Sequence, residues 1–253
     1  MHFDILTIFP ELFASPLQEG ILRRALLADQ IRVRLHNIRD WATDKHAMTD
    51  DRPFGGGEGM VMKPEPLAAC LKDVQKDEQS RVILLSPRGV PYNQKTAERL
   101  AGFERLILVC GRYEGVDERF SRLYVDEELS IGDYILTGGE LAAMVVVDSV
   151  TRLVPGVLGS ADSAANDTFS HGLLKHGHYT RPREFEGLTV PEVLLGGDHA
   201  RIEEYRFLES VRETLNRRPA LLADREFSAA EKKQLEKAGL LEQIQDATER
   251  YGS

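Results

Sequence analysis

The first 150 residues alternate between short apolar runs and longer amphipathic stretches. Phe3 to Phe9, Val82 to Leu85 and Leu106 to Val109 are short and mostly apolar, which predicts β-strands. Ile31 to Ile38 alternates apolar and polar residues and predicts a half-exposed strand. We expect a further short strand over Leu123 to Val125.

Helices are expected between these strands. The predicted helices cover Pro66 to Val74, Asn93 to Leu100, Val116 to Leu123 and Gly139 to Val150. The last of these is apolar nearly all round, which is typical of a buried helix. This regular alternation of strands and helices predicts an α/β fold with a largely parallel sheet.

The pattern changes after Pro155. Residues 159–170 are small and polar, which is the composition of a flexible linker. Beyond them the chain is helical in pattern and rich in charge: Asp198 can cap a helix, and Ser228 with Glu231 forms a capping box. We therefore expect an α/β domain over residues 1–159, a flexible linker over 160–170, and a small helical domain over 171–253.

Composition narrows the class of protein. Of the 253 residues, 42% are hydrophobic and 29% are charged, which suits a well-solvated domain with a real core. The formal net charge of −9 argues against a nucleic-acid partner unless a local basic surface is present. Cys70 and Cys110 stand in apolar surroundings and are expected to be buried thiols in a reducing compartment. We expect neither a signal peptide nor a membrane span.

Three apolar segments break into glycines, hydroxyls and carboxylates. They are Leu84 to Gly89 (LLSPRG), Cys110 to Arg119 (CGRYEGVDER) and Ser130 to Glu140 (SIGDYILTGGE). Because the carboxyl ends of parallel strands meet at one edge of a sheet, these segments predict a single ligand site built from several loops. Glu140 by itself also fits an ordinary helix start, where a carboxylate complements the helix dipole.

A fourth glycine-rich segment, Phe54 to Met60 (FGGGEGM), has two interpretations. Its backbone amides could face an anion or the segment could move as a lid, but a flexible surface loop is slightly favoured. It lacks the Gly-Lys-Ser/Thr ending of a P-loop. No G-x-G-x-x-G turn follows the first strand, so a Rossmann-type site is unsupported.

The segment from Lys175 to Arg183 combines cations with His178 and Tyr179. This composition suits contact with RNA phosphates and bases. A solvated loop is the alternative, and the acidic residues Glu184 and Glu186 favour it. The spacing of the histidines in this region disfavours a zinc site.

Arg152 and Asp167 are candidates for a chemical pair. An arginine can hold an anionic oxygen in its fork of donors, and an aspartate can accept a proton from a neighbouring atom. The pattern alone favours simpler roles: a solvated cation after a buried helix for Arg152, and a helix cap or linker carboxylate for Asp167.

Longer strings along the whole chain carry a family resemblance. They are FDILTIFPELF, FGGGEGMVMKPEP, LLSPRG, CGRYEGVDER, SIGDYILTGGELAAMVVVDSVTRLVPGVLG, DTFSHGLLKHGHYTRP and PEVLLGGDH, in this order. Together they closely resemble the bacterial tRNA (guanine-N1)-methyltransferase family of the SPOUT class. Two positions depart from the family: Glu58 and Gly177 stand where proline is usual.

The resemblance implies an α/β domain with a deep trefoil knot, an S-adenosylmethionine site in the knot, a cytoplasmic location, and a homodimer with active sites at the subunit interface. It assigns cofactor binding to residues in the three glycine-containing segments. These are Ser86, Pro87, Gly111, Tyr113, Glu114, Ser130, Ile131, Gly132, Tyr134, Leu136, Gly138 and Gly139.

The resemblance also implies the chemistry. The methyl group passes from S-adenosylmethionine to N1 of guanosine 37 in tRNA, just 3′ of the anticodon. Asp167 corresponds to the general base, and Arg152 to the residue that stabilises charge on guanine O6. A magnesium requirement is implied, with Glu114 as a candidate contact and no fixed metal site.

Two other functions compete with this interpretation. One is an RNA-binding module that keeps the fold without turnover, against which the presence of Arg152, Asp167 and the glycine turns argues. The other is a SPOUT methyltransferase that acts on ribosomal RNA or on a ribose 2′-oxygen.

Overall fold

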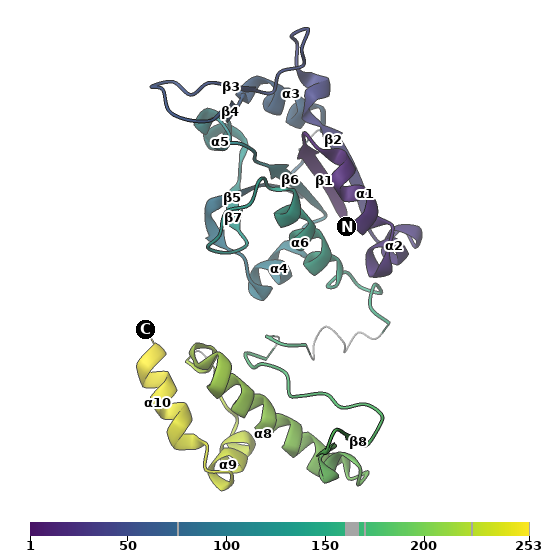
Figure 1. Cartoon of the computed structure of the whole chain (residues 1–253), viewed down its shortest axis with the longest axis vertical. Coiled ribbons are helices and arrows are strands. Elements are labelled where there is room, and N and C mark those ends of the chain that lie inside the picture. Colours follow the sequence, from purple (N-terminus) through teal and green to yellow (C-terminus); the bar gives the residue numbers. More distant parts are fainter. Residues whose placement is uncertain (75, 160–166, 170, 224, 253) are drawn as a thin grey trace. The chain divides into compact units, whose positions relative to one another are not determined.

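The computed structural model describes residues 1–74, 76–159, 167–169, 171–223 and 225–252. The chain forms two compact units, Met1–Ala161 and Asp162–Ser253. Most of the predicted linker, residues 160–166 and 170, lies outside the described residues. Figure 1 labels most helices and strands of both units, and the units are described one at a time below.

The first unit is built on a five-stranded sheet in which every pair of neighbouring strands is parallel. In spatial order the strands are β2 (Arg32–Asn37), β1 (His2–Thr7), β6 (Arg105–Cys110), β5 (Ser80–Pro91) and β7 (Glu127–Ser130). The prediction of an α/β fold with a largely parallel sheet is confirmed.

Helices cover both faces of this sheet (Figure 1). Because side chains alternate along a strand, β1 sends Phe3 and Ile5 into one core and Leu6 into the other. The helices are η1 (Pro10–Phe13), α1 (Ala14–Leu17), α2 (Gly20–Leu27), η2 (Ile38–Trp41), α3 (Pro64–Val74), α4 (Gln94–Leu100), α5 (Glu118–Tyr124) and α6 (Glu140–Thr151). Residues of α2, α4 and α6 join the first core, and those of α3 and α5 join the second.

Two sequence predictions about strands are wrong. The strand expected over Leu123 to Val125 does not form, because α5 runs to Tyr124 and the strand begins at Glu127. β5 does not end in a turn at Ser86, but continues to Pro91 with a shift of register between Leu85 and Val90. The shift pushes the intervening residues out of the regular ladder.

A short antiparallel hairpin, β3 (Asp50–Asp51) and β4 (Val61–Met62), encloses the glycine-rich segment. Phe54, at the start of that segment, is 98% exposed. The hairpin is joined to the segment after β6, because Met62 and Val116 form an isolated parallel bridge. The glycine-rich loop is therefore attached to the sheet edge where β6 ends.

The second unit is mainly helical in its described residues. Its elements are β8 (Glu184–Phe185), β9 (Leu188–Thr189), η3 (Glu192–Leu194), α8 (His199–Arg217), η4 (Pro219–Leu222), α9 (Ala229–Lys237) and α10 (Leu241–Tyr251). The helices pack around a small core that includes Val211, Leu222 and Leu235. Asp198 caps α8, and Ser228 with Glu231 forms the predicted capping box of α9.

Candidate cofactor-binding site

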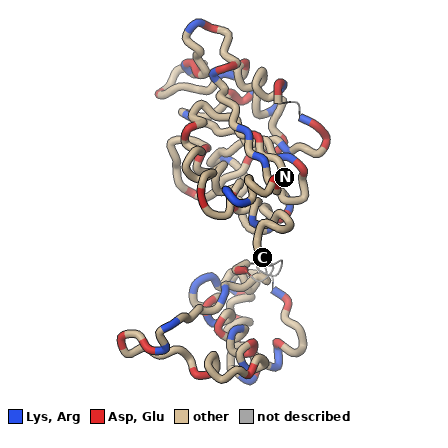
Figure 2. The backbone as a smooth tube through the Cα atoms, turned by 90° about the vertical axis from the view of Figure 1, so that its right-hand side faces the viewer, with Lys and Arg blue, Asp and Glu red and all other residues tan. Residues whose placement is uncertain are grey.

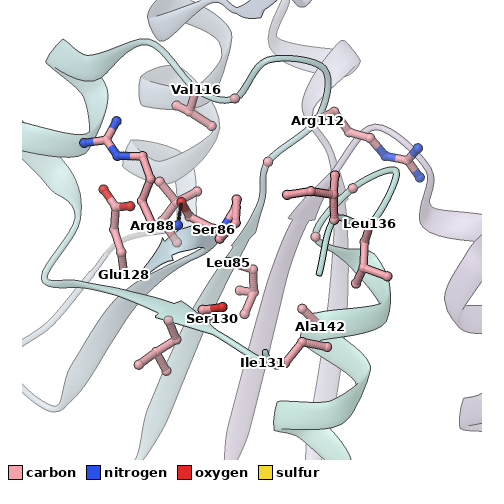
Figure 3. A pocket seen from close by; sticks show the side chains of 18 of the residues that line it. Leu85, Ser86, Arg88, Arg112, Val116, Glu128, Ser130, Ile131, Leu136 and Ala142 are labelled. Atoms are coloured by element: carbon pink, nitrogen blue, oxygen red, sulfur yellow. Dashed lines mark hydrogen bonds between the residues drawn. The ribbon is translucent and has the colours of Figure 1, made fainter. Parts of the chain in front are cut away.

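The three glycine-containing segments of the first unit line one pocket (Figure 3). The residues predicted to bind the cofactor all belong to its lining: Ser86, Pro87, Gly111, Tyr113, Glu114, Ser130, Ile131, Gly132, Tyr134, Leu136, Gly138 and Gly139. The prediction that these segments meet is confirmed. Their role in cofactor binding stays a prediction.

The first wall comes from the irregular part of β5. The backbone N–H of Arg88 donates a hydrogen bond to Ser86 Oγ at 3.2 Å, which holds a local turn. Gly89 is required at this point, because a Cβ there would clash with the backbone of Leu129. The close approach of β5 to β7 thus brings Ser86 and Pro87 to the pocket.

The second wall is the turn that follows β6. Tyr113 has φ 59°, and Gly115 has φ 119°, so two residues of this turn adopt left-handed backbone conformations. Such a conformation is uncommon for tyrosine and is held by its surroundings. The N–H of Glu114 donates to Met60 O at 2.9 Å, and the N–H of Met62 donates to Gly115 O at 2.9 Å. The glycine-rich loop therefore fixes the shape of this turn.

The third wall runs from β7 to the start of α6. The N–H of Gly132 donates to Ser130 Oγ at 3.3 Å, and the N–H of Gly139 donates to Gly111 O at 2.9 Å. A Cβ on Gly139 would lie 2.8 Å from Cys110 Cα, so this position requires glycine. The second and third walls are thereby in direct backbone contact.

The pocket combines an apolar side with polar groups. Figure 3 shows Leu136 and Ala142 on one side and the side chains of Arg88 and Glu128 on the other. Arg88 lies in the predicted segment Leu84 to Gly89 but was not among the predicted cofactor-binding residues. Sequence reasoning missed Glu128, because it precedes the segment Ser130 to Glu140 and lies outside all three predicted segments. Apolar surface next to backbone donors and acceptors suits a flat heterocyclic ring with polar edges.

Cys110 lies beside the pocket but is not suited to nucleophilic chemistry. It is fully buried, and burial, together with the negative charge of Glu140, raises the pKa of its thiol well above the usual value. Burial likewise raises the pKa of Cys70 to about 12. Both cysteines therefore remain neutral thiols at physiological pH.

The two predicted catalytic residues belong to different units. Arg152 follows α6 as its C-cap, and its N–H donates to Asp148 O at 3.2 Å. Asp167 belongs to the second unit, where Lys175 Nζ lies 3.2 Å from its Oδ1. Catalytic roles for both residues stay predictions.

The described residues contain no group of three or more histidine, cysteine or acidic side chains arranged to hold a metal ion. His176 and His178 stack on one another, with ring centroids 4.7 Å apart. Among the helices that the structure describes, none is both long and apolar enough to cross a bilayer.

Comparison with known proteins identifies the family. The family model described as tRNA (Guanine-1)-methyltransferase TrmD matches residues 1–224. A tRNA (guanine-N(1)-)-methyltransferase of Geotalea uraniireducens (strain Rf4) is 56% identical over 237 residues, which cover 93% of this chain and 96% of that protein. Proteins with the same name from Geobacter sulfurreducens and Dehalococcoides mccartyi are 54% and 52% identical, each over 92% of this chain and 95% of the relative.

The fold and the pocket define the class: an α/β protein with a glycine-lined ligand site at one edge of a parallel sheet. The comparisons then define the particular family. The chain belongs to the tRNA (guanine-1)-methyltransferase TrmD family.

Proposed function

We propose that this protein transfers a methyl group from S-adenosylmethionine to N1 of the guanosine at position 37 of tRNA. One observation carries this proposal. A chain of the TrmD family brings all of its predicted cofactor-binding residues to a single pocket. The convergence of three segments that are distant in sequence supports a built ligand site.

The pocket residues fit the proposed cofactor. Ser86 and Ser130 offer hydroxyls, and the backbone from Ser130 to Gly139 offers donors and acceptors for a heterocycle. Leu136 and Ala142 offer apolar surface for its face. When bound, the cofactor supplies an electrophilic methyl group on a sulfonium.

The chain's own residues would activate guanine. N1 carries a proton and is a poor nucleophile until that proton is removed. In the proposed mechanism the carboxylate of Asp167 accepts this proton, and the guanidinium of Arg152 stabilises the negative charge that develops toward O6. Holding guanine and the methyl donor in fixed orientation contributes further to the rate.

Local basic segments support tRNA as the substrate in spite of the net charge of −9. Figure 2 shows lysine and arginine interleaved with acidic residues on both units. Tyr179, Arg181 and Arg183 are exposed in the second unit, where they are accessible to a phosphate backbone. We assign tRNA binding to residues 171–253 and cofactor binding to residues 1–159.

Finer features of the family complete the proposal. We infer a homodimer with active sites at the subunit interface. An apolar groove along α6 supports a dimer, since Leu141 and Val145 in its lining are 60% and 43% exposed.

We also infer a trefoil knot around the pocket, a cytoplasmic location, and a magnesium requirement in which Glu114 takes part.

Methyl transfer to an unmodified tRNA transcript, with labelled cofactor and subsequent nucleoside analysis, tests the function. The expected product is 1-methylguanosine at position 37, with no product from a transcript that carries adenosine there. Binding without label transfer would favour the RNA-binding module. Label on a ribose 2′-oxygen, or on ribosomal RNA alone, would favour a different SPOUT activity.

A further inference from the structure

Glu140, the first residue of α6, is a buried carboxylate that the proposed chemistry does not use. Its side chain is 2% exposed. Thr7 Oγ1, at the end of β1, donates a hydrogen bond to its Oε1 at 2.8 Å, and Arg112 Nε donates to its Oε2 at 2.9 Å. This arrangement goes beyond the helix-dipole role expected from the sequence, because both oxygens have partners in other elements.

Arg112 is held from several sides at once. One of its terminal nitrogens donates to Thr137 O at 3.1 Å, and its guanidinium lies over the ring of Phe9, 4.4 Å from the centroid. The N–H of Phe9 in turn donates to Thr7 Oγ1 at 2.9 Å. Figure 3 shows the side chain of Arg112 directed away from Ser86 and Ser130. The guanidinium therefore supports the wall of the pocket and does not fill its interior.

The ion pair lies where two walls of the pocket meet. Arg112 and Gly138 form an isolated antiparallel bridge, and Gly139 donates to Gly111 O directly beside it. Gly138 has no space for a Cβ, which would collide with the side chains of Arg112 and Glu140. The backbone contacts between the two walls and the side-chain ion pair of Arg112 and Glu140 are therefore packed directly against each other.

A carboxylate buried this deeply is costly unless its hydrogen bonds are made. Loss of Glu140 would leave the guanidinium of Arg112 only partly paired and release its hold on Thr137. Loss of the Thr7 hydroxyl would remove the anchor that ties Glu140 to the sheet. In either case the loop from Leu136 to Gly139 would be less constrained.

We propose that Glu140 is a positioning residue. Anchored by Thr7, it holds Arg112, and Arg112 in turn keeps the wall that contains Gly111 at the distance from the wall that contains Gly139 that cofactor binding requires. The inference rests on the proposed function, since it assigns the pocket to S-adenosylmethionine. Glu140 does not itself contact the cofactor in this proposal. It acts only through the shape of the loop that precedes α6.

Thr7 and Thr49 provide a matched pair for the test. Both are fully buried threonines of the first unit. Thr7 Oγ1 bonds to Glu140, whereas Thr49 Oγ1 has no hydrogen-bond partner in the part of the chain that the structure describes. Thr7→Val removes the anchor to Glu140 together with the acceptor of the Phe9 N–H, whereas Thr49→Val makes the same chemical change at a hydroxyl without a described partner. Thr7→Ser keeps the hydroxyl and both of its contacts.

The test is calorimetric titration of the full-length protein with S-adenosylhomocysteine, below the onset of unfolding of every variant. We expect Glu140→Ala to weaken binding by about tenfold, as for the loss of a hydrogen bond to a charged group. Thr7→Val should weaken it to a smaller degree, whereas Thr7→Ser and Thr49→Val should bind as the wild type does. Glu140→Gln should recover most of the affinity, because its amide can still accept from Arg112 and donate to Thr7.

Binding of tRNA in the absence of cofactor separates positioning from general loss of structure. We expect it to be unchanged in Thr7→Val, which remains the test if Glu140→Ala does not fold. Wild-type cofactor affinity in Thr7→Val and in any folded Glu140→Ala protein would overturn this inference alone. Equal weakening in Thr7→Val and Thr49→Val, or parallel loss of tRNA binding, would also overturn it. A wild-type protein that does not bind S-adenosylhomocysteine would overturn the proposed function as well.

Discussion

The pocket of the first unit and the cationic segment of the second unit are held in opposite ways. The pocket walls are joined by backbone hydrogen bonds and by a partly buried ion pair, Arg112–Glu140. In the cationic segment, Lys175 to Arg183, most side chains are exposed. His176 stacks on His178, Lys175 pairs with Asp167, and Tyr179 contacts Tyr205 of α8.

This difference matches the two ligands of the proposed reaction. A small cofactor gains affinity from a pocket that is already formed, because little order has to be created on binding. A tRNA backbone is attracted by charge over a wide surface, and exposed cations can provide this attraction without a rigid pocket. Disturbing each region should therefore affect a different ligand.

The largest expected effect comes from Asp167 in the second unit. Asp167→Ala should reduce the single-turnover rate of methyl transfer by about two to four orders of magnitude, the usual cost of losing a general base. Cofactor affinity should be unchanged, because the pocket belongs to the first unit. Lys175→Ala, which removes this ion-pair contact of Asp167 and keeps the carboxylate, is the control and should lose much less activity. A near-normal rate in Asp167→Ala would contradict the assignment.

The next effect is expected at Gly139. Gly139→Ala should weaken cofactor binding by about tenfold, because its Cβ would press on the backbone of Cys110 and overpacking of this kind costs roughly 1–3 kcal/mol. Gly159→Ala is the matched control, since nothing lies near its Cβ. Gly111→Ala should also be milder, because the nearest atom is 3.5 Å away. Equal affinities for all three variants, measured by calorimetry, would contradict this account.

The sequence predicted the meeting of the three segments because each follows an apolar run, and parallel strands end at a common edge. The sequence prediction was wrong just before β7. Leu123 to Val125 is apolar enough for a strand, but the structure shows that Tyr124 still belongs to α5. The continuation of β5 was missed because Ser86 to Gly89 has the composition of a turn. Only the register with β7 shows it as part of a strand.

The role of Glu140 lay beyond sequence reasoning for a different reason. Its partner Thr7 is 133 positions away, and no local pattern relates the two. A carboxylate at a helix start has a sufficient local explanation, so nothing in the sequence indicated burial. Long-range pairing of this kind becomes visible only when the fold is known.

Alanine variants at Gly56 and Gly59 allow two positions in the glycine-rich loop to be compared. Both have φ 77°, so alanine strains the backbone equally at each. Only at Gly59 would the Cβ meet another group, the side chain of Glu114 at 2.5 Å. We expect Gly59→Ala to lower kcat/KM for methyl transfer several-fold relative to Gly56→Ala. Equal loss in both variants would show that the position of Glu114 does not matter.

The smallest expected effect concerns acid stability of the sheet. Burial alone would raise the pKa of Asp4, but hydrogen bonds and charge from His36 and Arg105 lower it overall. Because the folded-state pKa lies below the unfolded value of about 3.9, the stabilisation is complete above that pH and is lost as the pH falls through the folded value. The temperature at which the first unit unfolds should therefore depend less steeply on pH in the acid range in Asp4→Asn than in the wild type. An equally steep dependence would assign the acid sensitivity to other carboxylates.

Hydrogen exchange of the full-length protein tests the division between the two regions most directly. S-adenosylhomocysteine alone should protect amides in residues 110–116 and 130–140 and leave those of residues 171–183 unchanged. Subsequent addition of unmodified tRNA should protect residues 171–183 and the amides around Asp167. Protection of the second unit by the cofactor alone, with no change in residues 130–140, would contradict the account.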